Sequence, residues 1–287
     1  MSLFKIGTLS DWFKVGILEG IKASNEVGAQ GVQLYAWDGL HPDHVDPSFI
    51  DKIKHVAVEN EQTIVALCGE LGGHGFEIKK DNDKKVQYLK GVIDIAAKLD
   101  CKVVTTHIGR IPDDNKSERY QNMKDACKDV SDYAAHQNVV VAIETGPEKI
   151  ATLVGFIQDC ETKGLGINYD PGNLVMVTQE DEVQGVYTGK DYIVHTHAKD
   201  GVFKKYLGTE AAYEIFATGG IEALSSITDY FLETPLGQGE VRWVEYLRAL
   251  RDIGYKGYLT IEREVSENAK ADIILAVNYL KTTIEKL

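Results

Sequence analysis

Eight short apolar segments, separated by longer stretches with helical periodicity, constrain the fold of this chain more than any other feature. Most of the segments lack an alternation of polar and apolar residues, which is typical of parallel strands that are covered on both faces. The stretches between them, such as 84–100 and 119–137, repeat apolar residues at helical spacing. The expected strands lie within residues 4–9, 31–37, 63–70, 102–109, 139–146, 165–172, 192–200 and 257–264.

Eight units of strand and helix predict an α/β fold, a (β/α)8 TIM barrel that residues 1–287 form as a single domain. A doubly wound open sheet is the alternative, but eight strands in eight units favour closure. Strands begin at regular intervals near residues 139, 165 and 192, whereas the next one begins only at residue 257. We therefore expect an insertion at residues 202–240, an elaborated loop with one or two helices that forms a lid after the seventh strand.

The charge and the cysteines narrow the class of protein. Lys and Arg number 31 against 44 Asp and Glu, and a net charge of -13 disfavours nucleic acid as a partner. No run of about 18 apolar residues is present, so a membrane partner is not expected. The four cysteines are far apart in the sequence and predict neither a disulfide framework nor a zinc knuckle. We expect a cytoplasmic protein that acts on a small molecule, and a homo-oligomer stays open.

Ionisable residues stand at the ends of the last four expected barrel strands: Glu144, Asp170, His197 and Glu262. The carboxyl ends of all strands meet at one mouth in a (β/α)8 barrel, so these side chains can converge. A lone histidine in a strand is more often a core residue with its hydrogen bonds satisfied than a metal ligand. Three carboxylates and an imidazole at successive strand ends instead favour a divalent metal such as Mn, Mg, Co or Zn, because the carboxylates would repel one another without a cation.

The period of two along a strand distinguishes the two histidines of the segment YIVHTHAKD. His195 and His197 point to the same face, and His197 is nearer the mouth, so we take His197 as the ligand. His195, Asn168 and Thr260 then lie one layer beneath, where they can orient the ligands. Asn173, in the DPGN sequence that follows the sixth strand, is assigned to the same supporting group.

Residues near other strand ends are candidates for substrate contacts. His107 can polarise a substrate oxygen, Glu70 can bind a hydroxyl and Trp37 can cover an apolar ring face. Plain packing is the alternative for Trp37, and capping of a loop is the alternative for Glu70.

Three further charged residues follow the expected ligands directly. Lys199 and Asp200 can pair with each other or reach the substrate, and Arg263 can bind a carboxylate or a phosphate. The glycine-rich stretches 72–75 and 164–166 lack the context of a dinucleotide fingerprint, and neither a Walker loop nor a GxSxG elbow is present. The sequence therefore predicts no cofactor beyond the metal.

The sequences AIETG, NYDPGN, HTHAKD, TIERE and PLGQGEVRW together resemble the xylose isomerase-like TIM barrel family of sugar phosphate isomerases and epimerases. The resemblance covers nearly the whole chain. It implies a barrel with one divalent metal, often Mn, held by Glu144, Asp170, His197 and Glu262.

The resemblance also implies an activity. A metal-dependent isomerase or epimerase of the family acts on a small ketose, sugar phosphate or polyol derivative through an enediolate, with Glu144 and Glu262 as base and acid in turn. The alternative within the family is a lyase of the inosose dehydratase type, in which the enediolate expels a β-hydroxyl. A DNA repair enzyme like endonuclease IV is disfavoured by the charge and by Asn173, which stands where that group has a histidine. A sugar-binding module without activity is disfavoured by the complete ligand set.

Overall fold

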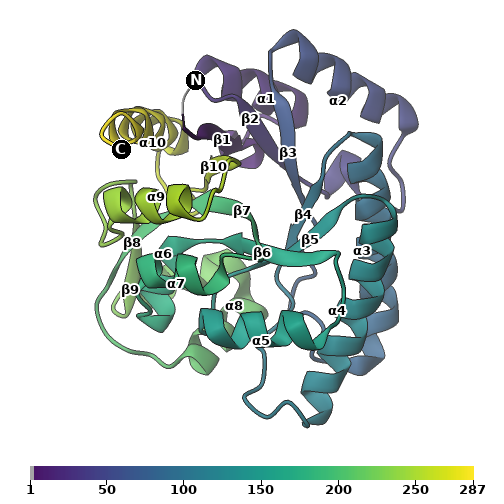
Figure 1. Cartoon of the computed structure of the whole chain (residues 1–287). Coiled ribbons are helices and arrows are strands. Elements are labelled where there is room, and N and C mark those ends of the chain that lie inside the picture. Colours follow the sequence, from purple (N-terminus) through teal and green to yellow (C-terminus); the bar gives the residue numbers. More distant parts are fainter. Residues whose placement is uncertain (1–2) are drawn as a thin grey trace.

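Eight parallel strands close into a barrel in the computed structural model, which describes residues 3–287 (Figure 1). The first barrel strand pairs with the second and also with the last, so the sheet has no open edge, and the predicted closed barrel is confirmed. Each of the eight segments expected to form a strand contains one. The barrel strands are β1 (Lys5–Leu9), β2 (Gly31–Tyr35), β3 (Thr63–Cys68), β4 (Val103–Thr106), β5 (Val140–Glu144), β6 (Leu165–Tyr169), β7 (Ile193–Ala198) and β10 (Tyr258–Ile261).

Helices follow the strands and surround the barrel (Figure 1). Their apolar faces are buried against the outer side of the sheet, as Leu89 and Ile93 of α3 show. The longer helices are α1 (Ile17–Glu26), α2 (Pro47–Glu59), α3 (Lys79–Lys98), α4 (Glu118–His136), α5 (Ile150–Asp159), α7 (Glu182–Gly189), α8 (Thr209–Leu224), α9 (Trp243–Asp252) and α10 (Ala269–Ile284). The short ones are η1 (Ser10–Phe13), η2 (Asp38–Leu40), α6 (Pro171–Asn173), η3 (Leu174–Thr178) and η4 (Ser225–Ile227).

The interior of the barrel is polar near the carboxyl ends of the strands. Gln33, Asn168, His195 and His197 are all buried there, whereas the space between strands and helices holds apolar side chains. Buried polar groups are costly unless they bind one another or a ligand. The polar interior therefore marks the end of the barrel at which a functional site is to be sought. Among residues 3–287, the structure has no helix that is both long enough and apolar enough to cross a membrane.

The segment between β7 and β10 contains α8, η4 and a two-stranded antiparallel sheet that the sequence pattern did not predict. Its strands, β8 (Asp200–Phe203) and β9 (Phe231–Thr234), pair antiparallel. The buried side chains of Met176, Ala212, Ile227 and Phe231 form a small hydrophobic cluster that joins the segment to η3. The two strands of this sheet are only four residues long and lie far apart in the sequence, so periodicity alone could not reveal their pairing.

Asp200 anchors this two-stranded sheet, and its predicted role as a substrate contact is wrong. Its carboxylate accepts hydrogen bonds from the backbone N–H groups of Gly201, Gly237, Gly239 and Val241 and from Nε1 of Trp243, at 2.8 to 3.2 Å. Both oxygens are therefore already satisfied, and the side chain is 1% exposed. The carboxylate holds the loop after β9 against the start of β8.

We expect Asp200→Ala to lower the free energy of unfolding by roughly 3 kcal/mol, because several buried N–H donors would lose their acceptor. Urea denaturation measures this loss. The exposed Asp191 offers the matched control, and Asp191→Ala should change the free energy of unfolding by no more than about 0.5 kcal/mol. Equal effects of the two substitutions would contradict the anchoring role.

Candidate functional site

The four residues expected to bind a metal come together at the mouth of the barrel. One ligand atom from each of Glu144, Asp170, His197 and Glu262 lies within 4.8 Å of all the others, and all four side chains are buried. Ligands about 2.0–2.6 Å from one ion lie on the order of 4 to 5 Å apart across it. The cluster therefore has the dimensions of a site that could hold one metal ion.

Each of the four residues is placed by the end of its strand. Glu144 is the last residue of β5 and His197 is the penultimate residue of β7, while Asp170 and Glu262 directly follow β6 and β10. Asp170 also caps α6, because its Oδ1 accepts a hydrogen bond of 3.0 Å from the backbone N–H of Asn173. This cap fixes the carboxylate and leaves Oδ2 free to face the cluster.

Gln33, from β2 on the far side of the barrel, orients His197. Its Oε1 lies 3.2 Å from Nε2 of His197 and 3.0 Å from Nε2 of His195, and its own amide donates to Oγ1 of Thr105. Both imidazoles therefore present Nε2–H to the same oxygen. Nδ1 of His197 then faces the carboxylates, 3.1 Å from Glu262 and 3.4 Å from Glu144. Gln33 was not among the predicted site residues, although a glutamine within an apolar strand is a signal.

The electrostatics of the cluster are those of a cation site. Burial alone would lower the pKa of His197, but the carboxylates of Glu262 and Glu144 hold this pKa well above its ordinary value. Burial raises the pKa of Asp170 to about 7, although Lys199 opposes the rise. The three carboxylates and the adjacent Glu264 face three groups that can carry a positive charge, His197, Lys199 and His107, so an excess of negative charge remains when all four carboxylates are ionised.

Oδ2 of Asp170 is the clearest sign that the donor set fits a metal. It is fully buried, makes no hydrogen bond within the described residues, and has only ionic neighbours at 3.5 Å (Lys199) and 3.8 Å (His197). A buried oxygen without a partner is costly, and a divalent ion is the partner that a mixed carboxylate and imidazole set selects.

The residues predicted to support the ligands differ in what they contact. Asn168 and Asn173 donate to Oε2 and Oε1 of Glu144, each at 3.1 Å, so both carboxylate oxygens are oriented. Burial lowers the pKa of His195 to about 3, which keeps this ring neutral beneath His197. Thr260 is the exception, because its buried hydroxyl makes no hydrogen bond within residues 3–287. The role of Thr260 in orienting a ligand therefore stays a prediction.

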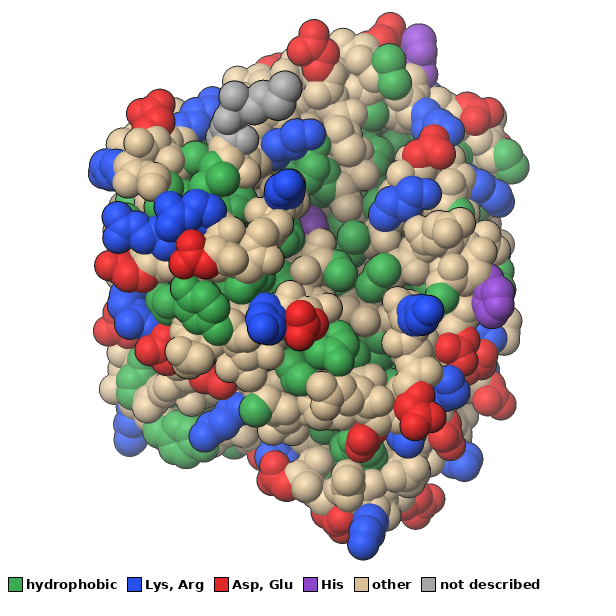
Figure 2. Space-filling view, viewed as in Figure 1, with side chains coloured by type: hydrophobic (Ala, Val, Ile, Leu, Met, Phe, Trp, Pro, Cys, Tyr) green, Lys and Arg blue, Asp and Glu red, His purple; other side chains and the backbone are tan. Residues whose placement is uncertain are grey.

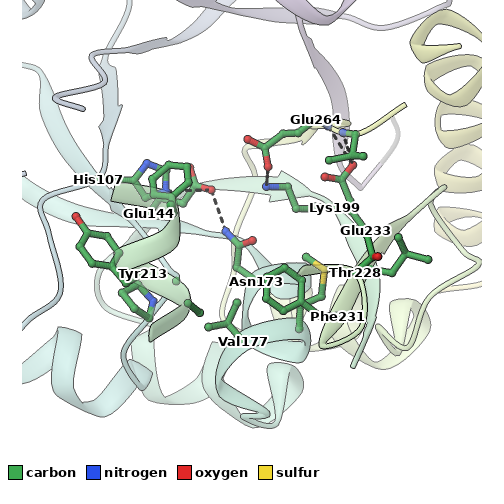
Figure 3. A pocket seen from close by; sticks show the side chains of 17 residues that line it. His107, Glu144, Asn173, Val177, Lys199, Tyr213, Thr228, Phe231, Glu233 and Glu264 are labelled. Carbon is green, nitrogen blue, oxygen red and sulfur yellow. Dashed lines mark hydrogen bonds and ion pairs between the residues drawn. The ribbon is translucent and has the colours of Figure 1, made fainter. Parts of the chain in front are cut away.

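A cavity of about 110 Å³ opens beside the cluster (Figure 3). Its polar side is formed by residues of the barrel, and its opposite wall by apolar residues of η3, α8 and β9. Figure 3 shows Val177 and Phe231 across from Lys199 and Glu264. The polar side consists mainly of His107, Glu144, Asn173, Lys199 and Glu264, and the apolar wall mainly of Met176, Val177, Phe216, Phe231 and Leu232. Of the four candidate ligands, Glu144 lines this cavity directly.

Lys199 and His107 both reach the cavity, as expected for substrate contacts. Nζ of Lys199 lies 2.6 Å from Glu262 and 2.7 Å from Glu264, so its partner is not Asp200. Nδ1 of His107 lies 2.7 Å from Glu70, and Nε2 lies 3.8 Å from Glu144. Burial alone would lower the pKa of His107, but Glu70 and Glu144 raise this pKa to about 10. A charged imidazole therefore faces the cavity and can donate a hydrogen bond there.

Arg263 and Trp37 lie outside this cavity. Arg263 pairs with Glu233 at 2.6 Å and with Asp272 at 2.8 Å, so the guanidinium is occupied by carboxylates of the protein, and its predicted role in binding a substrate anion is wrong. Trp37 is 42% exposed and stacks on Tyr35 with ring centroids 4.1 Å apart, next to a different cavity.

Glu264 and the apolar wall were missed in the sequence analysis. Glu264 lies two residues after Glu262. Side chains two residues apart in a strand point to the same face, so extending the expected strand to residue 264 would have placed Glu264 beside Glu262. The aromatic residues of the wall belong to the segment between β7 and β10, and nothing in their spacing indicated which of them face the site.

Glu148 is a buried acid that follows Pro147 of the cavity wall, and its charge interacts with Arg110, His107 and Tyr213. Burial raises the pKa of its carboxyl to about 8, against the opposing charges of Arg110 and His107, and its Oε2 makes no hydrogen bond within the described residues. The folded protein therefore keeps this proton up to a higher pH than the unfolded chain does.

We expect the stabilisation from the Glu148 proton to be complete below about pH 4.3 and to be lost as the pH rises to about 8. Glu148→Gln should remove this loss and make the protein more stable than the wild type at pH 8 by roughly 3 kcal/mol. Denaturant unfolding at several pH values tests this, with the exposed Glu285→Gln as control. A pH profile of Glu148→Gln that is parallel to that of the wild type would contradict it.

The closed (β/α)8 barrel and the acidic cluster at its mouth define the class: a TIM barrel whose strand ends could hold one divalent metal ion. Within this class, the family model of the xylose isomerase-like TIM barrel matches residues 21–283, and the chain belongs to this family. An uncharacterized protein of Methanocaldococcus jannaschii is 24% identical over 216 residues, which are 70% of this chain and 64% of that relative. The chain thus spans just under two thirds of the length of this curated relative.

Solved structures with the same fold include proteins with different activities in their names. A xylose isomerase domain protein from Planctomyces limnophilus has a TM-score of 0.79 at 24% identity, with 99% of this chain and 97% of that chain covered. A probable 3-DHS dehydratase from Bacillus anthracis has a TM-score of 0.76 at 17% identity, with 97% and 99% covered. A D-tagatose 3-epimerase-like protein has a TM-score of 0.74 at 19% identity, with 99% of both chains covered. At these identities the likeness establishes the fold.

Proposed function

We propose that this protein is a divalent-metal-dependent isomerase or epimerase that acts on a small ketose or polyol derivative through an enediolate. The observation that carries the proposal is the convergence of Glu144, Asp170, His197 and Glu262 beside a cavity, with a buried oxygen of Asp170 left without a hydrogen bond. A bound metal would polarise the hydroxyl and carbonyl oxygens of the substrate and lower the pKa of the adjacent C–H. Mn suits the donor set, and Mg, Co or Zn are alternatives.

Glu144 is placed to transfer the proton. It lines the cavity, and burial would raise its pKa, but His197 and His107 hold this pKa below its ordinary value, so the carboxylate is ionised and can accept a proton. Asn168 and Asn173 fix both of its oxygens. Glu262 approaches His197 and Lys199 instead, and we assign it the return of the proton on the opposite side of the substrate.

Two features of the cavity support chemistry on an enediolate. The ring of His107 can donate a hydrogen bond to a substrate oxygen that gains negative charge, and Glu70 holds this ring in place. The wall that contains Phe216 and Phe231 covers the cavity with apolar side chains. Such a cover excludes water, which strengthens the electrostatic interactions inside and protects the intermediate.

A lyase is the second candidate, because a dehydratase and an epimerase-like protein both occur among the similar structures. The same residues would remove the first proton in either reaction. The reactions differ only afterwards: the enediolate is reprotonated in an isomerase or epimerase, and it loses a β-hydroxyl in a lyase of the inosose dehydratase type.

Cleavage of DNA is not supported by the surface or by the site. Figure 2 shows Lys and Arg side chains interspersed with Asp and Glu on the face drawn, and the net charge of the chain is -13. Asn173 donates to Glu144, so at this position an amide orients a ligand where an endonuclease IV-like site would need a further metal-binding histidine.

The proposal is tested by incubating the Mn-loaded protein with ketoses, inososes and hydroxypyruvate, and by analysing the products with mass spectrometry and chromatography. An isomer of unchanged mass supports the isomerase or epimerase. A product that has lost one water selects the lyase. Neither product from any of these substrates would contradict the proposal.

A further inference from the structure

A second cavity, of about 770 Å³, lies beside the first at the ends of β2 and β3. It contains none of the four candidate metal ligands. Glu70 lines the second cavity and His107 lines the first, and these two side chains are joined by the 2.7 Å contact described above. The two cavities therefore meet at this pair of side chains, and a molecule bound at the metal cluster can extend over the pair into the second cavity.

Trp37 forms a fixed aromatic surface at the border of this cavity. One face of its ring stacks on Tyr35 at an interplanar angle of 11°, and its Nε1 donates a hydrogen bond of 2.8 Å to Oδ1 of Asp11. The ring is nevertheless 42% exposed. An exposed tryptophan that is held on one face and at its N–H has lost its rotamer freedom before any ligand binds. The apolar C–H face of a sugar ring is a suitable partner for such a surface.

The polar residues around Trp37 suit a neutral ligand rich in hydroxyl groups. Gln87 and His41 offer both donors and acceptors. The carboxylates of Asp43, Glu70 and Asp83 outnumber the ammonium groups in the second cavity, which belong to Lys84 and Lys85.

Lys85 is moreover already engaged, because its Nζ donates to the backbone carbonyls of Gly72 and Gly75. The cavity thus lacks the cluster of free cations that a phosphate requires.

We propose that the second cavity binds an uncharged hexopyranose unit. The substrate of this protein is then a glycoside or a glycosyl ketose, not a free monosaccharide phosphate. The step that places the reacting unit at Glu144 rests on the proposed function, whereas binding of the hexopyranose unit beside Trp37 does not. The volume of the second cavity is within the range of small-molecule sites, and it is larger than a single reacting ketose at the metal cluster needs.

Equilibrium binding of methyl β-D-glucopyranoside to the metal-free protein tests this inference without turnover. Saturation-transfer NMR and tryptophan fluorescence give the Kd. We expect Trp37→Ala to raise this Kd at least about tenfold, Trp37→Phe to keep it within about threefold, and Tyr206→Ala, at a 61% exposed aromatic residue of the segment after β7, to leave it unchanged. Glucose 6-phosphate should bind more weakly than the methyl glucoside.

Three results would overturn the inference: no binding of the methyl glucoside to the wild type, an unchanged Kd in Trp37→Ala, or tighter binding of glucose 6-phosphate. These results are separate from the fate of the proposed function. If methyl glucoside fails to bind while a ketose is isomerised, the second cavity is wrongly assigned and the proposed function stands. If it binds beside Trp37 while no substrate turns over, the proposed function fails and the sugar site stands.

Discussion

Replacing Glu144 or Glu262 by glutamine should abolish turnover and leave the fold intact. We expect kcat/KM to fall by at least about 10³-fold in each variant, because the substitution removes both a metal-ligand charge and the group that transfers the proton. Glutamine has nearly the shape of glutamate, and Asn168 and Asn173 can still donate to the remaining carbonyl oxygen at position 144. Steady-state kinetics measure the loss, and circular dichroism measures the fold.

Glu285→Gln is the matched control for these two variants, because Glu285 is exposed and lies at the end of α10, away from the cluster. It should have the activity of the wild type. Activity within a few fold of the wild type in either Glu144→Gln or Glu262→Gln would show that the residue is neither the base nor the acid.

Removal of the metal should have the second largest effect. Treatment with a chelator should abolish activity, and Mn should restore it. Because the ion would bind the folded cluster and not the unfolded chain, Mn at about 100 times its Kd should stabilise the protein by about 2.7 kcal/mol. For a barrel of this size, we expect a rise in Tm of roughly 5 °C in thermal denaturation.

Asp170→Asn provides the control for the thermal shift. Asparagine keeps the shape of the cap on α6 and removes the charge of a candidate ligand whose Oδ2 makes no hydrogen bond within the described residues. The rise in Tm on addition of Mn should therefore vanish in Asp170→Asn. An equal rise in this variant and in the wild type would place the bound metal elsewhere on the protein.

The strands and the four candidate ligands could be predicted from the sequence because both depend on local regularities. Apolar runs of strand length recur in units, and the period of two places His195 beneath His197 and Asn168 beneath Asp170. A closed barrel then brings all strand ends together whatever the details of the loops. This is why residues far apart in the sequence, such as Glu144 and Glu262, could be assigned to one cluster.

The errors arise where a side chain is bound by a partner from a distant part of the chain. Asp200 has the charge and the place of a substrate contact, but backbone groups at residues 237–241 bind it. Arg263 follows Glu262, but Glu233 of β9 occupies its guanidinium. Gln33 acts on His197 from across the barrel. Such pairings depend on three-dimensional contacts between segments whose relative positions no local pattern determines.

The central claim is that the cluster around His197 uses a metal to move a proton at the carbon next to a carbonyl. The incorporation of deuterium into a ketose is the most direct test of this claim. A turned-over ketose from the product screen is incubated in D2O with chelator-treated protein, with and without added Mn, and its mass is measured after the protein is removed. We predict incorporation of one deuterium next to the carbonyl with Mn, and none without Mn or with Glu144→Gln. Turnover without incorporation from solvent under any condition, or equal incorporation with and without Mn, would contradict the claim.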